Sequence, residues 1–222
     1  MDLDLKGRVV LVTGAGQGLG REIGLAFARE GALVAFHYHS SGAGAEEAAA
    51  DAGRLTGAAL AVQADIRKDD DVSAMVEGVE SQLGPIGVLV NNAAATGLKP
   101  FLNTTPDDWS FQIDVTVTGT LRVTQAVAKR MVERKDGVIV SLMGDSGRVG
   151  ESGLSVTATA RAGTMALTKS LAKELARAGI RANCVSIGLV QTERFAEHAG
   201  AASGTAPDDE RMQRIVAQYP LR

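Results

Sequence analysis

The sequence predicts an α/β fold, a doubly wound parallel sheet with helices on both faces, in one domain over residues 1–222. Short apolar runs typical of buried strands alternate with helical patterns along the chain, which favours right-handed crossovers between parallel strands. The first apolar run leads directly into a glycine-rich turn and a helix. A chain of 222 residues without an internal repeat or a linker-like change in composition fits a single domain.

The first strand, turn and helix cover residues 9–28. Four apolar residues, 9–12, are followed by glycines at alternate positions, and helical spacing resumes at Ile23 and Phe27. Glycine lets the backbone approach a ligand closely, and the N-terminus of a helix attracts anions. The spacing, glycines at 14, 18 and 20 after Thr13, differs from the common G-x-G-x-x-G dinucleotide pattern. A glycine-rich turn without a ligand is the alternative interpretation.

The remaining elements follow in alternation. Further strands are expected over 32–36, 58–63, 86–90, 138–142 and 180–185, and helices over 46–54, 70–83, 106–133 and 157–178. Gly84-Pro85 ends one helix and Gly179 another, while Thr105 or Asp107 starts the longest. Residues 188–218 are rich in small and polar residues and are expected to form a flap over the carboxyl edge of the sheet.

Composition excludes several classes of protein. The net charge is −3 with acids and bases mixed along the chain, so neither nucleic acid nor an anionic membrane is an expected partner. No apolar run reaches transmembrane length, and the N-terminus lacks the apolar segment of a signal peptide. Cys184 is the only cysteine; we interpret it as an inert buried thiol in a cytoplasmic protein. No metal site is predicted.

Ligands of such sheets bind at the carboxyl ends of the strands, so the residues of a dinucleotide site are expected there. An NAD site usually places an acid at the end of the second strand, to bind the ribose 2′-hydroxyl. Here that place holds His39, Ser40 and Ser41, and the first acid is Glu46. NADP(H) is therefore favoured over NAD(H), although no arginine is present there. A solvated strand end is the alternative interpretation of His37 and His39.

The chain resembles the short-chain dehydrogenase/reductase family, in particular its 3-oxoacyl-carrier-protein reductases. The resemblance covers nearly the whole chain and depends on the glycine turn, Asp65, Asn91-Asn92-Ala93, Thr192 and the segments 137–141, 162–175 and 179–185. It implies a Rossmann-type fold, a homo-oligomer (dimer or tetramer) and a small-molecule or acyl-thioester substrate. It also implies that Gly14, Ala15, Gln17 and Leu19 hold the pyrophosphate and adenosine side, that Asp65 and Ile66 border the adenine, and that Asn92 and Ala93 border the adjoining ribose. The glycine turn and the end of the second strand add Gly16, Gly18, His39 and Ser40 to the expected cofactor site.

The family's catalytic set, Asn-Ser-Tyr-Lys, is not found. By resemblance, the four positions hold Thr116, Gly144, Thr157 and Arg161. A tyrosine phenol with pKa near 10 can be tuned by a neighbouring cation, whereas a threonine hydroxyl is far too weak an acid. Arg161 keeps a positive charge and would still bind ribose hydroxyls, but it cannot exchange a proton. The usual reductase mechanism is therefore expected to be lost.

Nearby residues offer weak substitutes. Asp145 and Ser146 follow Gly144 directly, and Ser146 would replace the missing serine unless it only shapes the loop. Asp145 is also expected to form an ion pair with Arg161, which would fill the pocket left by the replaced catalytic residues. His198, in the flap, is a further candidate. The family continues beyond a segment like 219–222, so its last helix and strand are expected to be absent from this sequence.

Three functions remain open. In the first, the chain is an oxidoreductase that acts on a carbonyl or 3-oxoacyl substrate with an improvised acid or water. Alternatively, it is a catalytically silent cofactor-binding partner of an active relative, with helices 106–133 and 157–178 forming an oligomer face. The third is an enzyme recruited to lyase or isomerase chemistry that uses Asp145 or Arg161.

Overall fold

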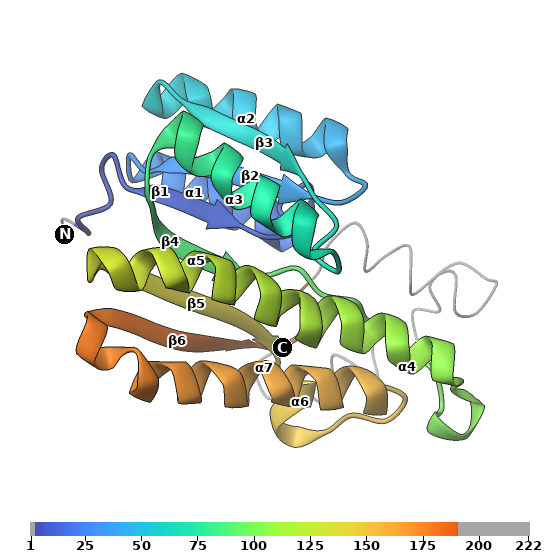
Figure 1. Ribbon diagram of the computed structural model, residues 1–222. Helices are drawn as coiled ribbons and strands as arrows, with labels where there is room; N and C mark the ends of the chain where they lie inside the picture. The colour runs from blue at the N-terminus through green and yellow to red at the C-terminus, as the bar shows by residue number, and fades with distance from the viewer. Residues whose placement is uncertain (1–2, 191–222) are drawn as a thin grey trace. The chain divides into compact units, whose positions relative to one another are not determined.

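The computed structural model describes residues 3–190 and contains six parallel strands in the order β3-β2-β1-β4-β5-β6. The sheet carries helices on both faces (Figure 1), so the predicted α/β fold is confirmed. Residues up to Gly188 form one compact unit. Almost all of the expected flap over 188–218, with Thr192 and His198, lies outside the described residues.

The first half of the sheet contains the glycine turn. Its elements are β1 (Val9–Val12), α1 (Gly18–Arg29), β2 (Leu33–Tyr38), α2 (Gly42–Thr56) and β3 (Ala59–Gln63). β2 extends two residues beyond the predicted end, because His37 is buried and Tyr38 still pairs with Gln63. α2 begins four residues earlier than predicted, where its first turn packs closely on the glycine turn.

The middle of the chain supplies α3 (Asp69–Leu83), β4 (Ile86–Asn91), α4 (Pro106–Ile113) and α5 (Thr120–Arg134). α4 begins with a capping box in which the Thr105 side chain accepts from the Asp108 amide and Asp108 accepts from the Thr105 amide. A wide π-helical turn, Asp114–Gly119, joins α4 to α5, so that the predicted helix 106–133 is one rod (Figure 1) with one irregular turn.

The last described part contains β5 (Gly137–Gly144), α6 (Ser146–Val149), α7 (Ser155–Glu174) and β6 (Ile180–Ile187). The single turn α6 was not predicted, because four residues show no periodicity. α7 closes with the 3₁₀ turn Ala176–Ala178, and Gly179 (φ +76°) makes the left-handed turn into β6. Both strands run two residues beyond their expected ends.

Two apolar layers cover the sheet. α3, α5 and α7 pack on one face and α1 and α2 on the other. On the second face Phe36 packs so closely on α1 that a Cβ at Gly24 would collide with its ring. Among residues 3–190, no helix combines the length and the apolarity needed to cross a bilayer, and no three metal-ligating side chains gather. Cys184 is half-buried, and burial raises the pKa of its thiol, which keeps it protonated.

Candidate functional site

The glycine turn leaves the N-terminus of α1 free to bind an anion. The first turn of α1 carries no acidic residue, and the N-cap, Gln17, makes no side-chain capping bond. The amides of Gly16 and Gln17 make no hydrogen bond to another described residue. Unpaired amides and the positive helix end therefore point to the same place, which fits a phosphate group.

The amides of Gly14 and Ala15 are already bonded to His37. Gly14 N–H donates to His37 Nδ1 (3.1 Å), and Ala15 N–H donates to the His37 carbonyl (2.7 Å). Both residues were expected to border the pyrophosphate, which stays a prediction. Their amides cannot serve that purpose without giving up these bonds, so the free amides of the turn are those that follow Ala15.

His37 links the first three strands. Its Nδ1 accepts from Gly14, which requires that Nε2 carries the proton and donates to the Ala64 carbonyl (3.1 Å). The residue is 2% exposed, and burial lowers its pKa to about 4. The interpretation of His37 as part of a solvated strand end was therefore wrong.

Tight backbone packing holds the turn against its neighbours. A Cβ at Gly16 would collide with the Ser41 carbonyl, and one at Gly44 with the Gly16 carbonyl. On the other side, Gly20 lies against the side chain of Asn92. These three glycines are thus required for the close approach of protein backbone, in addition to any ligand.

Asn92 and Thr13 join the ends of β1 and β4. Asn92 Nδ2 donates to the carbonyls of Thr13 and Gly14 (2.9 Å each), and the Thr13 hydroxyl accepts from the amides of Asn92 (3.0 Å) and Ala93 (3.1 Å). The amide side chain of Asn92 is therefore committed to shaping the turn. That Asn92 and Ala93 also border a ribose stays a prediction.

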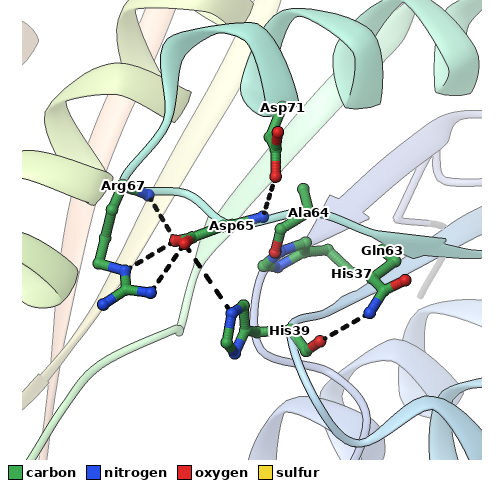
Figure 2. Close-up of polar contacts among 7 residues, drawn as sticks. All are labelled: His37, His39, Gln63, Ala64, Asp65, Arg67 and Asp71. Atoms are coloured by element: carbon green, nitrogen blue, oxygen red, sulfur yellow. Dashed lines mark hydrogen bonds and ion pairs between the residues drawn. The ribbon is translucent and has the colours of Figure 1, made fainter.

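At the ends of β2 and β3, Asp65 forms the polar centre shown in Figure 2. Its carboxylate accepts from Arg67 Nε (2.8 Å) and Nη2 (2.7 Å), and Arg67 lies over the ring of Phe111. The Arg67 guanidinium holds the pKa of Asp65 far below its usual range. His39 Nε2 lies 3.9 Å from Asp65 Oδ2, and the His39 side chain is 62% exposed.

A pocket of about 440 Å³ opens beside this cluster. It is lined by His39, Gln63, Ala64, Asp65, Lys68, Asp71 and Ala74. The predicted Ile66 lies away from it, buried against Gly119 at the π-helical turn. Lys68, an exposed cation at this pocket, was not among the site residues predicted from the sequence. The pocket thus carries an imidazole (His39), a cation (Lys68) and two carboxylates, Asp65 and Asp71, of which Asp65 is paired with Arg67.

The four positions matched to the catalytic set lie around the carboxyl end of β5. Thr157, 2% exposed, donates from its hydroxyl to Gln112 Oε1 (2.6 Å) and accepts from the amide of Gly97 (3.3 Å). Thr116, also 2% exposed, exchanges hydrogen bonds with the amide (3.0 Å) and carbonyl (3.3 Å) of Ala95. Both hydroxyls therefore hold the loop after β4 and have no free proton to offer.

Gln112 was not predicted from the sequence. It projects from α4, is 6% exposed, and reaches Thr157 on α7, 45 residues later in the chain. Its Nε2 would lie 2.9 Å from a Cβ at Gly97. A glutamine among the polar residues of an amphipathic helix is no signal of burial, and nothing in the sequence identified its partner.

Arg161 lies beside Gly144 and Ser146. A Cβ at Gly144 would meet Ser146 Oγ at 3.7 Å and Arg161 Nε at 4.0 Å, which are ordinary contact distances. Arg161 Nε is buried and has no hydrogen-bond partner among the described residues. Burial lowers the pKa of this guanidinium.

Asp145 does not pair with Arg161, so that expectation was wrong. Its carboxylate binds Arg148 Nε (2.9 Å) on the adjoining turn α6 and accepts from the Ser186 hydroxyl (2.8 Å). The bond from Arg148 lowers the pKa of Asp145. Asp145 is therefore ionised at neutral pH and lacks a proton to donate.

Comparisons with known proteins agree with this architecture. A model of the family described as short chain dehydrogenase matches residues 8–201. A 3-oxoacyl-(acyl-carrier-protein) reductase of Synechocystis sp. is 35% identical over 189 residues, which cover 85% of this chain and 76% of the relative. The oxidoreductase UcpA of Salmonella typhimurium is 36% identical over 220 residues, which cover 98% of this chain and 82% of the relative.

Solved structures show the same fold. A crystal structure described as a short-chain alcohol dehydrogenase of Sinorhizobium meliloti 1021 superimposes with a TM-score of 0.90 and 27% sequence identity. The superposition covers 99% of this chain and 84% of that protein.

Proposed function

The chain belongs to the short-chain dehydrogenase family, and on that premise we propose that it binds NADP(H) but lacks the family's proton-donating residues. In this proposal it is nominally an oxidoreductase for a carbonyl or 3-oxoacyl substrate, with little or no turnover by the usual mechanism. The bond between Thr157 and Gln112 carries the proposal, since it occupies the hydroxyl at the position matched to the catalytic tyrosine.

The cofactor part is supported by the glycine turn and its surroundings. The free amides after Ala15 and the open end of α1 suit a pyrophosphate, and His39 with Ser40 would receive the adenosine end. Asp65 is already neutralised by Arg67, which reduces its repulsion of a 2′-phosphate. When bound, the reduced cofactor supplies a hydride to a carbonyl carbon.

The catalytic part is supported by the side chains near the carboxyl end of β5, where the substrate carbonyl would accept the hydride. Reduction of a carbonyl leaves an alkoxide that must gain a proton, and general acid catalysis contributes about a hundredfold to ten-thousandfold in rate. Thr116 and Thr157 are bonded to buried protein groups, and Asp145 is ionised. Ser146 is a hydroxyl without a bond to another described residue, but its acidity is that of an alcohol.

A catalytically silent partner of an active relative is the second candidate. Large apolar side chains are exposed along α4 and α5, namely Trp109 (39%), Phe111 (55%), Ile113 (39%) and Leu121 (44%). Exposed apolar surface of this kind is typical of protein interfaces. It supports a homo-oligomer, or a hetero-oligomer in which the cofactor site stabilises the fold and the partner performs the chemistry.

The experiment measures NADPH binding by fluorescence and NADPH oxidation with a 3-oxoacyl thioester on the same protein. We expect NADPH binding without turnover above background; turnover at ordinary enzyme rates would refute the loss of the mechanism. A variant with Thr157→Tyr, Gly144→Ser and Arg161→Lys should stay inactive while Gln112 fills the space beside residue 157. Adding Gln112→Val should then raise the rate at least about a hundredfold.

A further inference from the structure

Arg161 is a positive charge without a counter-charge in the part of the chain that the structure describes. Its Nε atom is buried and unpartnered, and no carboxylate of residues 3–190 lies within ion-pair distance of its guanidinium. Burying a charge without a partner is costly, and natural sequences usually pair such groups or leave them exposed. Arg161 as a whole is only partly buried, but a guanidinium with a buried, unpartnered Nε suits a site whose anion arrives from outside the chain.

The surroundings of Arg161 are shaped for a small group. A methyl group placed on Gly144 would have Ser146 Oγ and Arg161 Nε as its nearest neighbours, so the backbone there leaves room beside both. Gly147 packs directly on the stem of Arg161, which fixes where the side chain leaves α7. Asp145, the residue after Gly144, is bonded instead to Arg148 and Ser186.

We propose that Arg161 and Ser146 bind the carboxylate of a small organic acid at the carboxyl end of β5. A guanidinium and a hydroxyl together match the two oxygens of a planar carboxylate, whereas a neutral ribose would leave the partly buried charge without a counter-charge. The inference deepens the proposed function and rests on it: the ligand beside the cofactor is a free acid with a carbonyl or hydroxyl group. A thioester, which has no negative charge at that point, would fit the site less well.

The test compares 3-hydroxybutanoate with its methyl ester by ligand-observed NMR titration, with and without NADP⁺. We expect wild-type protein to bind the acid at least tenfold more tightly than the ester. Arg161→Gln should remove this preference, whereas Arg161→Lys should keep part of it. The matched control is Arg177→Gln, which removes an exposed arginine just after α7 and should leave the preference unchanged. Equal binding of acid and ester by the wild type would overturn the proposal.

A second measurement does not depend on the choice of acid. Replacing a partly buried guanidinium whose Nε is buried without a partner by an apolar side chain of similar length should stabilise the ligand-free protein. Arg161→Met should therefore raise the melting temperature, and Arg177→Met should not change it. A fall of several degrees in Arg161→Met would show that the guanidinium has a protein partner, and the proposal would be wrong.

NADPH fluorescence titrations on the same samples separate this inference from the proposed function. Wild-type protein that binds NADPH but shows no preference for the acid contradicts the carboxylate site alone. Preference for the acid without NADPH binding contradicts the cofactor proposal and supports the site. If Arg161→Gln weakens NADPH more than tenfold and acid and ester bind alike, the guanidinium serves the cofactor and the carboxylate site is refuted.

Discussion

The hydroxyl of Thr157 donates a 2.6 Å hydrogen bond to the side-chain oxygen of Gln112, and neither residue is more than 6% exposed. The same hydroxyl accepts from the amide of Gly97. One threonine therefore joins α7, α4 and the loop after β4. At a position where we expect a phenol in relatives, this chain uses a buried alcohol as a structural connection.

Thr157→Val tests that connection. The substitution keeps the shape of the side chain but leaves Gln112 Oε1 without a donor and the Gly97 amide without an acceptor. A buried polar group left unsatisfied costs about 1–3 kcal/mol, so we expect the free energy of unfolding to fall by about 2 kcal/mol. Urea denaturation followed by circular dichroism measures the change.

Thr159→Val is the matched control, because Thr159 lies on the same helix, is exposed and bonds only to Ser155 in the preceding turn. It should change stability by less than about 0.5 kcal/mol. Adding Gln112→Leu to Thr157→Val should recover much of the loss, since replacing both partners removes the unsatisfied oxygen. Equal effects of Thr157→Val and Thr159→Val would mean that the buried bond contributes nothing.

Local patterns were sufficient to predict the sheet and its helices. The strands are continuous apolar runs such as Val9–Val12, and parallel strands between two helical layers must be apolar on both faces. Boundaries were less accurate where tertiary packing extends an element, as when α2 starts at Gly42 against Gly16. The irregular turn Asp114–Gly119 contains Thr116, whose hydroxyl binds the distant Ala95, a contact that no local pattern contains.

The sheet edge that carries the candidate site could be predicted from the sequence, but the side-chain contacts within it could not. The glycine turn, Asp65 and the Asn92 loop were found because each follows a strand, and parallel strands bring their ends to one edge. The partners of the polar groups could not be found in this way. His37 binds Gly14 and Gln112 binds Thr157 across 23 and 45 residues. Asp145 binds an arginine three residues away, Arg148, in place of the distant partner that was expected.

The lowered pKa of the buried His37 should make the stability of the fold depend on pH. Its folded pKa of about 4 lies below the ordinary 6.5, so between these values the unfolded chain binds more protons than the folded protein. The free energy of unfolding should therefore fall as the pH decreases from about 6.5 to about 4, by up to about 3 kcal/mol. Protonation of Nδ1 would also set a proton against the Gly14 amide and disturb the glycine turn.

His37→Gln should remove most of this slope, because a glutamine can donate and accept like the imidazole but does not titrate. His39→Gln is the control: it removes the exposed neighbour and should keep the slope. Carboxylates with lowered pKa, such as Asp65 and Asp108, lose their contribution at lower pH, below the pKa of an ordinary acid. A slope that survives in His37→Gln would assign the acid sensitivity to other groups.

A substitution at His39 should shift the cofactor preference from NADP(H) towards NAD(H). It is the exposed side chain at the end of β2, where an NAD site carries an acid, and it lies at the pocket with Lys68. His39→Glu should weaken NADPH binding about tenfold or more, because a carboxylate repels the 2′-phosphate, and should leave NADH binding equal or tighter. His39→Gln, of similar size and without charge, should change the ratio of the two dissociation constants much less. Fluorescence titrations of both cofactors at one ionic strength measure that ratio. An unchanged ratio in His39→Glu would mean that the 2′-phosphate lies away from β2, and the preference for NADP(H) would then lack its physical basis.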